Sequence, residues 1–220
     1  MQFRLMVVVL IGLCSFKAVA DENPSARWEK DITQLESKRK ALSEPHGRIL
    51  FVGSSSIRMW KLDESFPDRR TLNQGFGGSE IADSNYYFDR LITAAKPRAV
   101  VLYAGDNDLA KGKSPETVHA DFQKFVALAK EKLPAGTPVY FIAIKPSLKR
   151  WALADKIQAA NAAVKTTCDN DEQLIYVDVW GPMLNDQGTP RDDVFLQDGL
   201  HMNTAGYRIW ADTLRPLLKK

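Results

Sequence analysis

The sequence lacks an apolar run of the roughly 20 residues that a membrane span requires. An almost wholly apolar stretch, residues 5–14, follows the basic residue Arg4 and is followed by the small residues Ala18 and Ala20. A short apolar core between a basic residue and a small-residue site is typical of a secretory signal peptide. We therefore predict a signal peptide over residues 1–20, with cleavage after Ala20 and a periplasmic or secreted mature protein.

Cysteine is nearly absent, since the chain has only Cys14 and Cys168. Cleavage of the signal peptide leaves Cys168 alone, so the mature chain can form no intramolecular disulfide even in an oxidising compartment. Leu13 stands where lipid attachment to Cys14 would require a small residue, which disfavours a lipoprotein. Cys168 lies near the end of a helical segment with no glycine turn beside it, and we interpret it as a packed thiol.

A large charge of one sign is also missing. The chain has 30 basic and 27 acidic residues, and loss of Arg4 and Lys17 with the signal peptide leaves 28 basic residues, a net charge of +1. Such a weak, interspersed charge does not predict nucleic-acid binding. No His-Glu-x-x-His zinc motif and no complete G-x-x-x-x-G-K-[ST] phosphate loop occurs, so we predict neither a metal ion nor any other cofactor.

The composition, 45% hydrophobic and 26% charged, is that of an ordinary globular domain, which we place at residues 21–220. Short apolar segments alternate with amphipathic ones, a pattern that predicts a parallel sheet covered by helices on both faces. The expected fold class is therefore α/β, a three-layer α/β/α arrangement with about five strands. The predicted strands are residues 48–52, 71–73, 99–103, 139–144 and 174–178. The predicted helices are residues 24–42 (within an N-terminal segment, residues 21–45), 79–91, 115–133, 151–167 and 203–218.

Glycine and polar residues gather in the segments that follow the strands, directly after the first three and about twenty residues after the last. Four such segments stand out: GSSS at residues 53–56, GFGGS at 75–79, GDND at 105–108 and DGLH at 198–201. Because ligands of open α/β sheets bind at the carboxyl ends of the strands, these four segments predict one shared site.

Three of these residues have the chemistry of a nucleophilic triad. A serine hydroxyl needs an imidazole to accept its proton and a carboxylate to orient that imidazole. Asp198 and His201 are three residues apart and can supply both groups, and Ser55 follows a strand and a glycine at the start of a helix. We predict Ser55 as the nucleophile, with Ser54 and Ser56 as alternatives because of the serine run.

Negative charge that develops on a substrate oxygen requires preorganised donors. Gly78 lets its backbone N–H approach a substrate closely, and Asn107 offers a neutral amide donor. Together with the backbone N–H of Ser55, they are the predicted oxyanion hole.

The segments FVGSSS (51–56), NQGFGG (73–78), GDND (105–108) and DGLH (198–201) occur in the order found in the SGNH hydrolases, also called GDSL-type esterases and lipases. The chain resembles this family over about residues 49–210. The resemblance implies a flavodoxin-like sheet, Ser55 as nucleophile with Asp198 and His201, and oxyanion donors at Ser55, Gly78 and Asn107. Family members named for Gly-Asp-Ser carry aspartate before the nucleophile, whereas this chain has Ser54. We expect that difference to affect the positioning of the loop more than the reaction.

Four further residues are candidate substrate contacts: Trp60, Lys145, Arg150 and Trp151. They follow the nucleophile segment or the fourth strand, and they are equally compatible with turn and packing roles. A lysine or arginine there could meet an anionic or sugar group.

The sequence thus predicts an exported serine esterase that acts on a small-molecule ester through an acyl-enzyme intermediate. Lysophospholipids, thioesters and acetyl groups on carbohydrate are alternative substrates. The rival from another class is a non-catalytic periplasmic binding module on the same fold, since a fold alone does not establish activity.

Overall fold

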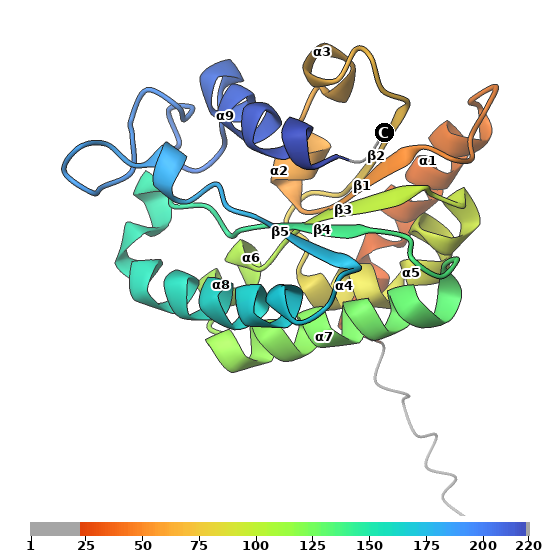
Figure 1. Cartoon of the computed structure of the whole chain (residues 1–220), viewed down its shortest axis with the longest axis horizontal. Helices are drawn as coiled ribbons and strands as arrows, with labels where there is room; N and C mark the ends of the chain where they lie inside the picture. The colour runs from red at the N-terminus through yellow and green to blue at the C-terminus, as the bar shows by residue number, and fades with distance from the viewer. Residues whose placement is uncertain (1–22, 219–220) are drawn as a thin grey trace, which may run out of the picture.

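The computed structural model describes residues 23–218, which form a five-stranded parallel sheet between two layers of helices (Figure 1). The predicted signal peptide, its cleavage site after Ala20 and Cys14 lie outside the described residues. The strands are β1 (Ile49–Gly53), β2 (Thr71–Gly75), β3 (Ala99–Tyr103), β4 (Val139–Ile142) and β5 (Leu174–Val177). Their order in the sheet is β2-β1-β3-β4-β5, the flavodoxin-like order. The predicted α/β fold class is confirmed.

The helices are α1 (Glu29–Lys40), α2 (Ser55–Arg58), α3 (Leu62–Ser65), α4 (Ile81–Tyr86), α5 (Phe88–Leu91), α6 (Asp106–Ala110), α7 (Pro115–Lys132), α8 (Ala154–Asp169) and α9 (Thr204–Leu214). The 3-10 turns are η1 (Pro24–Trp28), η2 (Thr93–Ala95), η3 (Leu148–Leu153), η4 (Gly181–Met183) and η5 (Arg215–Leu217). None of the helices within residues 23–218 combines the length and the apolar character that crossing a membrane requires.

Two apolar cores separate the three layers. In β1, Leu50 and Val52 pack into the core shared with α1, α4, α5, α7 and α8, whereas Ile49 and Phe51 face the core beneath α2, α3 and α9. Figure 1 shows α7 and α8 on one side of the sheet and α2, α3 and α9 on the other. Because alternate strand residues point to opposite faces, a fully apolar strand such as β1 is buried from both sides.

Several helix boundaries differ from the predicted ones for identifiable reasons. The helix expected over residues 79–91 is split at Tyr87, whose hydroxyl donates to the carbonyl of Ser25 in the N-terminal segment. The last helix ends at Leu214 because Pro216 disrupts the α-helical hydrogen bonding, and η5 follows. The short helices α3 and α6 were not expected, since four or five residues are too few to show a helical period.

The turn after β1 brings three strand ends together. Gly53 has φ of 132°, and a Cβ at this position would lie 1.9 Å from the carbonyl oxygen of Tyr103 at the end of β3. Ser54 N–H donates to that same oxygen at 3.0 Å, and Phe76 N–H, just after β2, donates to the Gly53 carbonyl at 2.9 Å. The start of α2 is therefore fixed between the loops that follow β2 and β3.

We expect Gly53→Ala to lower the free energy of unfolding by more than about 2 kcal/mol, because the new methyl group meets rigid backbone at a left-handed φ. Gly181→Ala is the matched control, since a Cβ there meets nothing within 4 Å, and we expect a change within about 0.5 kcal/mol. Urea denaturation of both variants measures the difference. Equal stabilities would contradict the close approach at Gly53.

Candidate active site

The serine run places its three hydroxyl groups in different surroundings. Ser54 and Ser56 are buried, whereas Ser55 is half-buried at the first position of α2. The Ser55 hydroxyl Oγ lies 3.0 Å from Nε2 of His201, 146 residues away in the sequence. Of the three serines, Ser55 is the one that the fold brings to the imidazole.

The other side of the His201 ring contacts Asp198. Nδ1 of His201 lies 2.6 Å from Oδ2 of Asp198, and Oδ1 accepts from the backbone N–H groups of Leu200 at 3.0 Å and His201 at 2.9 Å. The hydrogen bond from His201, followed by that from Leu200, lowers the pKa of the Asp198 carboxyl to about 2. The carboxylate is therefore ionised at neutral pH, and it holds the ring with Nε2 toward Ser55.

Contacts from two other elements hold α2 in place. The Asn73 side chain in β2 donates to the carbonyls of Ile57 at 2.7 Å and Trp60 at 3.2 Å, and the Tyr207 hydroxyl in α9 donates to the Ser56 carbonyl at 2.9 Å. Because these bonds reach the backbone around and after Ser55, β2 and α9 both position the nucleophile candidate.

Gly78 and Asn107, the two predicted oxyanion donors outside α2, lie close to each other. Gly78 has φ of 78°, a left-handed conformation that suits glycine. Asn107, in the first turn of α6, donates through Nδ2 to the carbonyl of Ser79 at 2.9 Å. The start of the 75–78 segment packs closely against α2, the helix that begins with Ser55, since a Cβ at Gly75 would lie 2.4 Å from the backbone nitrogen of Arg58.

Lys145 and Arg150 both turn toward the carboxylate of Asp106. Lys145 is 1% exposed, and its ammonium lies 3.6 Å from Asp106 Oδ2 and 3.4 Å from the hydroxyl of Tyr103. Burial lowers the pKa of Lys145, against the opposing attraction of Asp106. Arg150 Nη1 lies 2.8 Å from Asp106 Oδ2, and Nη2 donates to Oδ1 of Asn107 at 2.9 Å. Lys145 therefore does not reach the rim where a substrate contact was predicted.

The two tryptophans predicted as substrate contacts have different positions. Trp60 is buried in an aromatic cluster with Phe51 and Phe66, and its Nε1 donates to Ser65 Oγ at 2.8 Å. Trp151 in η3 is partly exposed and stacks on Trp180, with ring centroids 6.0 Å apart. Of the four candidates, Trp151 presents an aromatic surface near the strand ends, and Trp60 mainly stabilises the segment after α2.

A groove of about 640 Å³, which the sequence did not predict, lies near the Ser55–His201 pair, although neither of these two residues lines it. Its lining includes Met59, Trp60, Leu196, Met202, Tyr207 and Asp212. Met59 N–H donates to the Ser55 carbonyl at 2.9 Å, and Leu196 N–H donates to the His201 carbonyl at 2.7 Å. Met59 and Leu196 are 37% and 44% exposed, so both give the groove apolar surface, and its lining also includes the charged residues Lys61, Glu64, Arg208 and Arg215.

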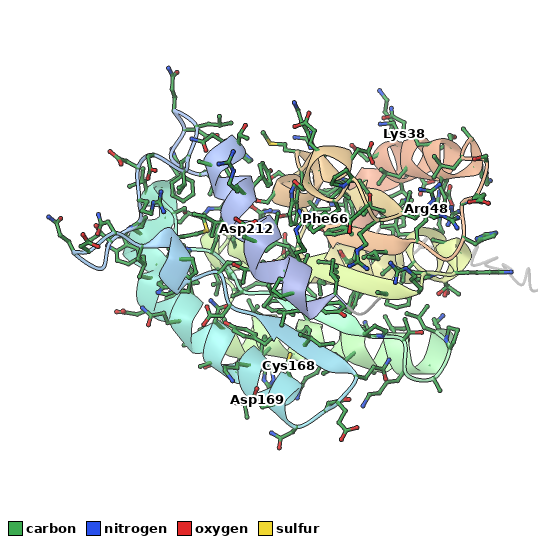
Figure 2. The ribbon with its side chains drawn as sticks, turned by 45° about the horizontal axis from the view of Figure 1, so that its top comes forward. Lys38, Arg48, Phe66, Cys168, Asp169 and Asp212 are labelled. Atoms are coloured by element: carbon green, nitrogen blue, oxygen red, sulfur yellow. The ribbon has the colours of Figure 1, made fainter. Side chains whose placement is uncertain are left out.

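The groove lies between α3 and α9. Asp212 on α9 and Phe66 at the end of α3 are labelled in Figure 2 and mark the two helices. Neither wall could be placed from the sequence, because both require the tertiary packing of elements far apart in the chain.

Other reactive side chains are held in structural roles. Burial raises the pKa of the Cys168 thiol to about 12, so it stays protonated. His46 contacts the carbonyl of Ala95, and His119 contacts the Thr167 hydroxyl. Across residues 23–218, no three or more His, Cys, Asp and Glu side chains form a group that could hold a metal ion.

Comparison with known proteins gives a family match and several similar folds. The model of the GDSL-like Lipase/Acylhydrolase family matches residues 53–209. No curated protein matches the chain significantly. A solved structure from Streptococcus pneumonia, whose name refers to platelet activating factor, is 21% identical, with a TM-score of 0.76 over 88% of this chain and 96% of that chain.

Two further solved structures share the fold. A GDSL-like lipase from Bacteroides thetaiotaomicron is 19% identical, with a TM-score of 0.71 over 85% of this chain and 96% of that chain. A catalytic mutant of an acetylxylan esterase from Geobacillus stearothermophilus is 16% identical, with a TM-score of 0.63 over 80% of this chain and 96% of that chain.

The geometry predicts how the reactivity of Ser55 depends on Asp198. We expect Asp198→Asn to slow the labelling of Ser55 by a fluorophosphonate about 10³- to 10⁴-fold, because the neutral amide no longer fixes the imidazole or stabilises its charge. Since the pKa of Asp198 is about 2, the wild-type carboxylate is ionised at every pH above about 4, and the labelling rate of Asp198→Asn should be below that of the wild type throughout this range. Asp193→Asn is the control, because that exposed carboxylate pairs with Arg191 instead. Equal labelling rates for the two variants would argue against a functional Asp198–His201 pair.

Proposed function

The chain belongs to the GDSL-like lipase/acylhydrolase family, and from that premise we propose that it is an exported serine esterase. It cleaves carboxylic ester bonds through an acyl-enzyme intermediate. The observation that carries this proposal is the continuous contact from Ser55 Oγ to His201 Nε2 at 3.0 Å and from His201 Nδ1 to Asp198 Oδ2 at 2.6 Å.

In the first step Ser55 Oγ attacks the ester carbonyl carbon and its proton passes to His201 Nε2. The carbonyl π electrons move to oxygen, and Asp198 stabilises the imidazolium that forms. The backbone N–H groups of Ser55 and Gly78 and the amide of Asn107 bind the oxyanion. Each donor of this kind contributes about 10²- to 10³-fold to the rate.

The tetrahedral intermediate then collapses. The bond between the carbonyl carbon and the alcohol oxygen breaks, and the proton on His201 Nε2 passes to that oxygen. The alcohol departs, and the acyl group remains bound to Ser55. His201 next takes a proton from water, whose oxygen attacks the acyl carbon. A second collapse returns the proton to Ser55 and releases the carboxylic acid, so the cycle needs no cofactor.

The surroundings of Ser55 support an ester with an apolar group. The groove near it has the apolar side chains of Met59, Leu196 and Met202 in its lining and could receive an acyl chain or a hydrophobic alcohol. Lysophospholipids and thioesters are compatible with that shape. A carbohydrate acetyl ester is the second candidate, because Trp151 and Trp180 form a flat aromatic surface and a similar fold is that of an acetylxylan esterase.

The cellular location belongs to the same proposal. The basic residue Arg4, the apolar core and the small residues before position 21 support signal-peptide cleavage after Ala20. The hydrolase domain, residues 21–220, is then periplasmic or secreted.

Hydrolysis of p-nitrophenyl esters from acetate to decanoate tests the proposal. We expect the mature protein to hydrolyse at least part of the series and Ser55→Ala to reduce kcat/KM by about 10³-fold or more, because the nucleophile is lost. Circular dichroism should show an intact fold in the variant.

Ser54→Ala and Ser56→Ala serve as matched controls within the same serine run, and we expect both to retain activity. A Ser55→Ala protein as active as the wild type would exclude Ser55 as nucleophile. A wild-type protein inactive on these esters and on acetylated carbohydrate would favour the binding-module alternative.

A further inference from the structure

Arg150 connects two consecutive residues of α6. Its Nη2 donates to Oδ1 of Asn107 at 2.9 Å, and its Nη1 lies 2.8 Å from Oδ2 of Asp106. The ammonium of Lys145 lies 3.6 Å from the same Asp106 oxygen. Asp106 and Asn107 are both buried, so water competes little for these contacts. The position of the guanidinium is therefore set by the carboxylate of the residue that precedes Asn107.

The amide of Asn107 could in principle face either way, since its oxygen and nitrogen exchange places on rotation by about 180°. In the observed orientation Nδ2 donates to the Ser79 carbonyl at 2.9 Å and has a second hydrogen left for another acceptor. The opposite orientation would set the amide oxygen against the Ser79 carbonyl and the amide hydrogens against the guanidinium of Arg150. Both contacts would be repulsive, so Ser79 and Arg150 together select one orientation.

We propose that Arg150 is a positioning residue that orients and polarises the Asn107 amide for oxyanion binding. This inference rests on the proposed esterase function. A cation on Oδ1 draws electron density from the amide, which makes its remaining N–H a stronger donor, and the effect is larger in a buried site. Arg150 thus acts on the reaction through Asn107 and does not itself touch the substrate.

The surroundings of Arg150 favour this role over substrate binding. Its side chain is 16% exposed, Nη2 donates to Asn107, and Nη1 forms an ion pair with Asp106. Its backbone, with φ of −121° and ψ of 19°, departs from helical geometry inside η3. The neighbouring Lys149 N–H donates at 2.9 Å to the carbonyl of Gly199, in the segment that carries Asp198 and His201. The η3 segment consequently contacts both the triad loop and the oxyanion donor.

A double-mutant cycle with Arg150→Met and Asn107→Ala, read as kcat and KM on the best p-nitrophenyl ester, tests the proposal. We expect Arg150→Met to lower kcat about tenfold, with KM changed by less than about twofold, because only the transition state uses the strengthened donor. Asn107→Ala should lower kcat about 10²-fold or more. The double variant should be no slower than Asn107→Ala alone, since Arg150 then has no amide to orient.

Two further variants separate charge, geometry and folding. Arg150→Lys keeps the cation but has lost the planar pair of donors, so we expect kcat between those of the wild type and Arg150→Met. Lys156→Met removes an exposed cation from the helix that follows η3 and should leave kcat unchanged. Thermal unfolding of every variant identifies any loss of folded protein, and if Arg150→Met does not fold, the cycle is run with Arg150→Lys.

Two results would overturn the proposal. One is the same fold-loss in kcat from the Arg150 substitution in the wild-type and Asn107→Ala backgrounds, and the other is an unchanged kcat in a folded Arg150→Met protein, with or without a raised KM. Ser55→Ala in the same assay distinguishes these failures from that of the esterase proposal. If Ser55→Ala is inactive, an additive cycle rejects only the role of Arg150. If Ser55→Ala is fully active, the esterase mechanism itself is rejected.

Discussion

The close approach of the chain at Gly53 to the end of β3 is the constraint on which the site depends. A side chain at this position would collide with the Tyr103 carbonyl, and the same carbonyl accepts the Ser54 N–H. Because β1 and β3 are neighbours where the strand order reverses, the turn places α2 at the point where open α/β sheets bind ligands. Phe76, just after β2, donates to the Gly53 carbonyl, and Ser55 Oγ lies 3.0 Å from Nε2 of the distant His201. The position of Ser55 thus depends on one backbone contact that only glycine permits.

Local patterns in the sequence were sufficient to predict the sheet and the groups at its edge. The apolar segments before Gly53 and Gly105 correspond to β1 and β3, since strands buried on both faces have no polar positions to obscure them. The edge strand β2, Thr71–Gly75, carries Asn73 and Gln74 and was predicted as a shorter strand over residues 71–73. Ser55, Asp198 and His201 could be picked out because a nucleophile, a base and an orienting carboxylate are recognisable by residue type at the ends of such elements. The structure brings their side chains into contact, and their catalytic roles are the proposal made from that contact.

The contacts of two cations and the groove near Ser55 could not be predicted. Arg150 and Lys145 follow the fourth strand and were equally compatible with substrate contact and with packing, and both face Asp106, which the sequence separates from them by about 40 residues. A lysine or arginine after a strand can either pair with a buried carboxylate or extend into solvent. Tertiary packing, which the sequence does not show, decides between the two. The groove beside Ser55 is a similar case, because α3 is too short to be recognised and the position of α9 depends on the whole core.

The most direct test of the account is the mass of the protein during turnover of a slowly hydrolysed ester, stopped by acid and followed by fragmentation of the peptide that carries residues 54–56. The account predicts a covalent gain of one acyl group, located on Ser55 and absent from the Ser55→Ala variant. Turnover without a covalent adduct under these conditions, or an acyl group on Ser54, Ser56 or Cys168, would contradict it.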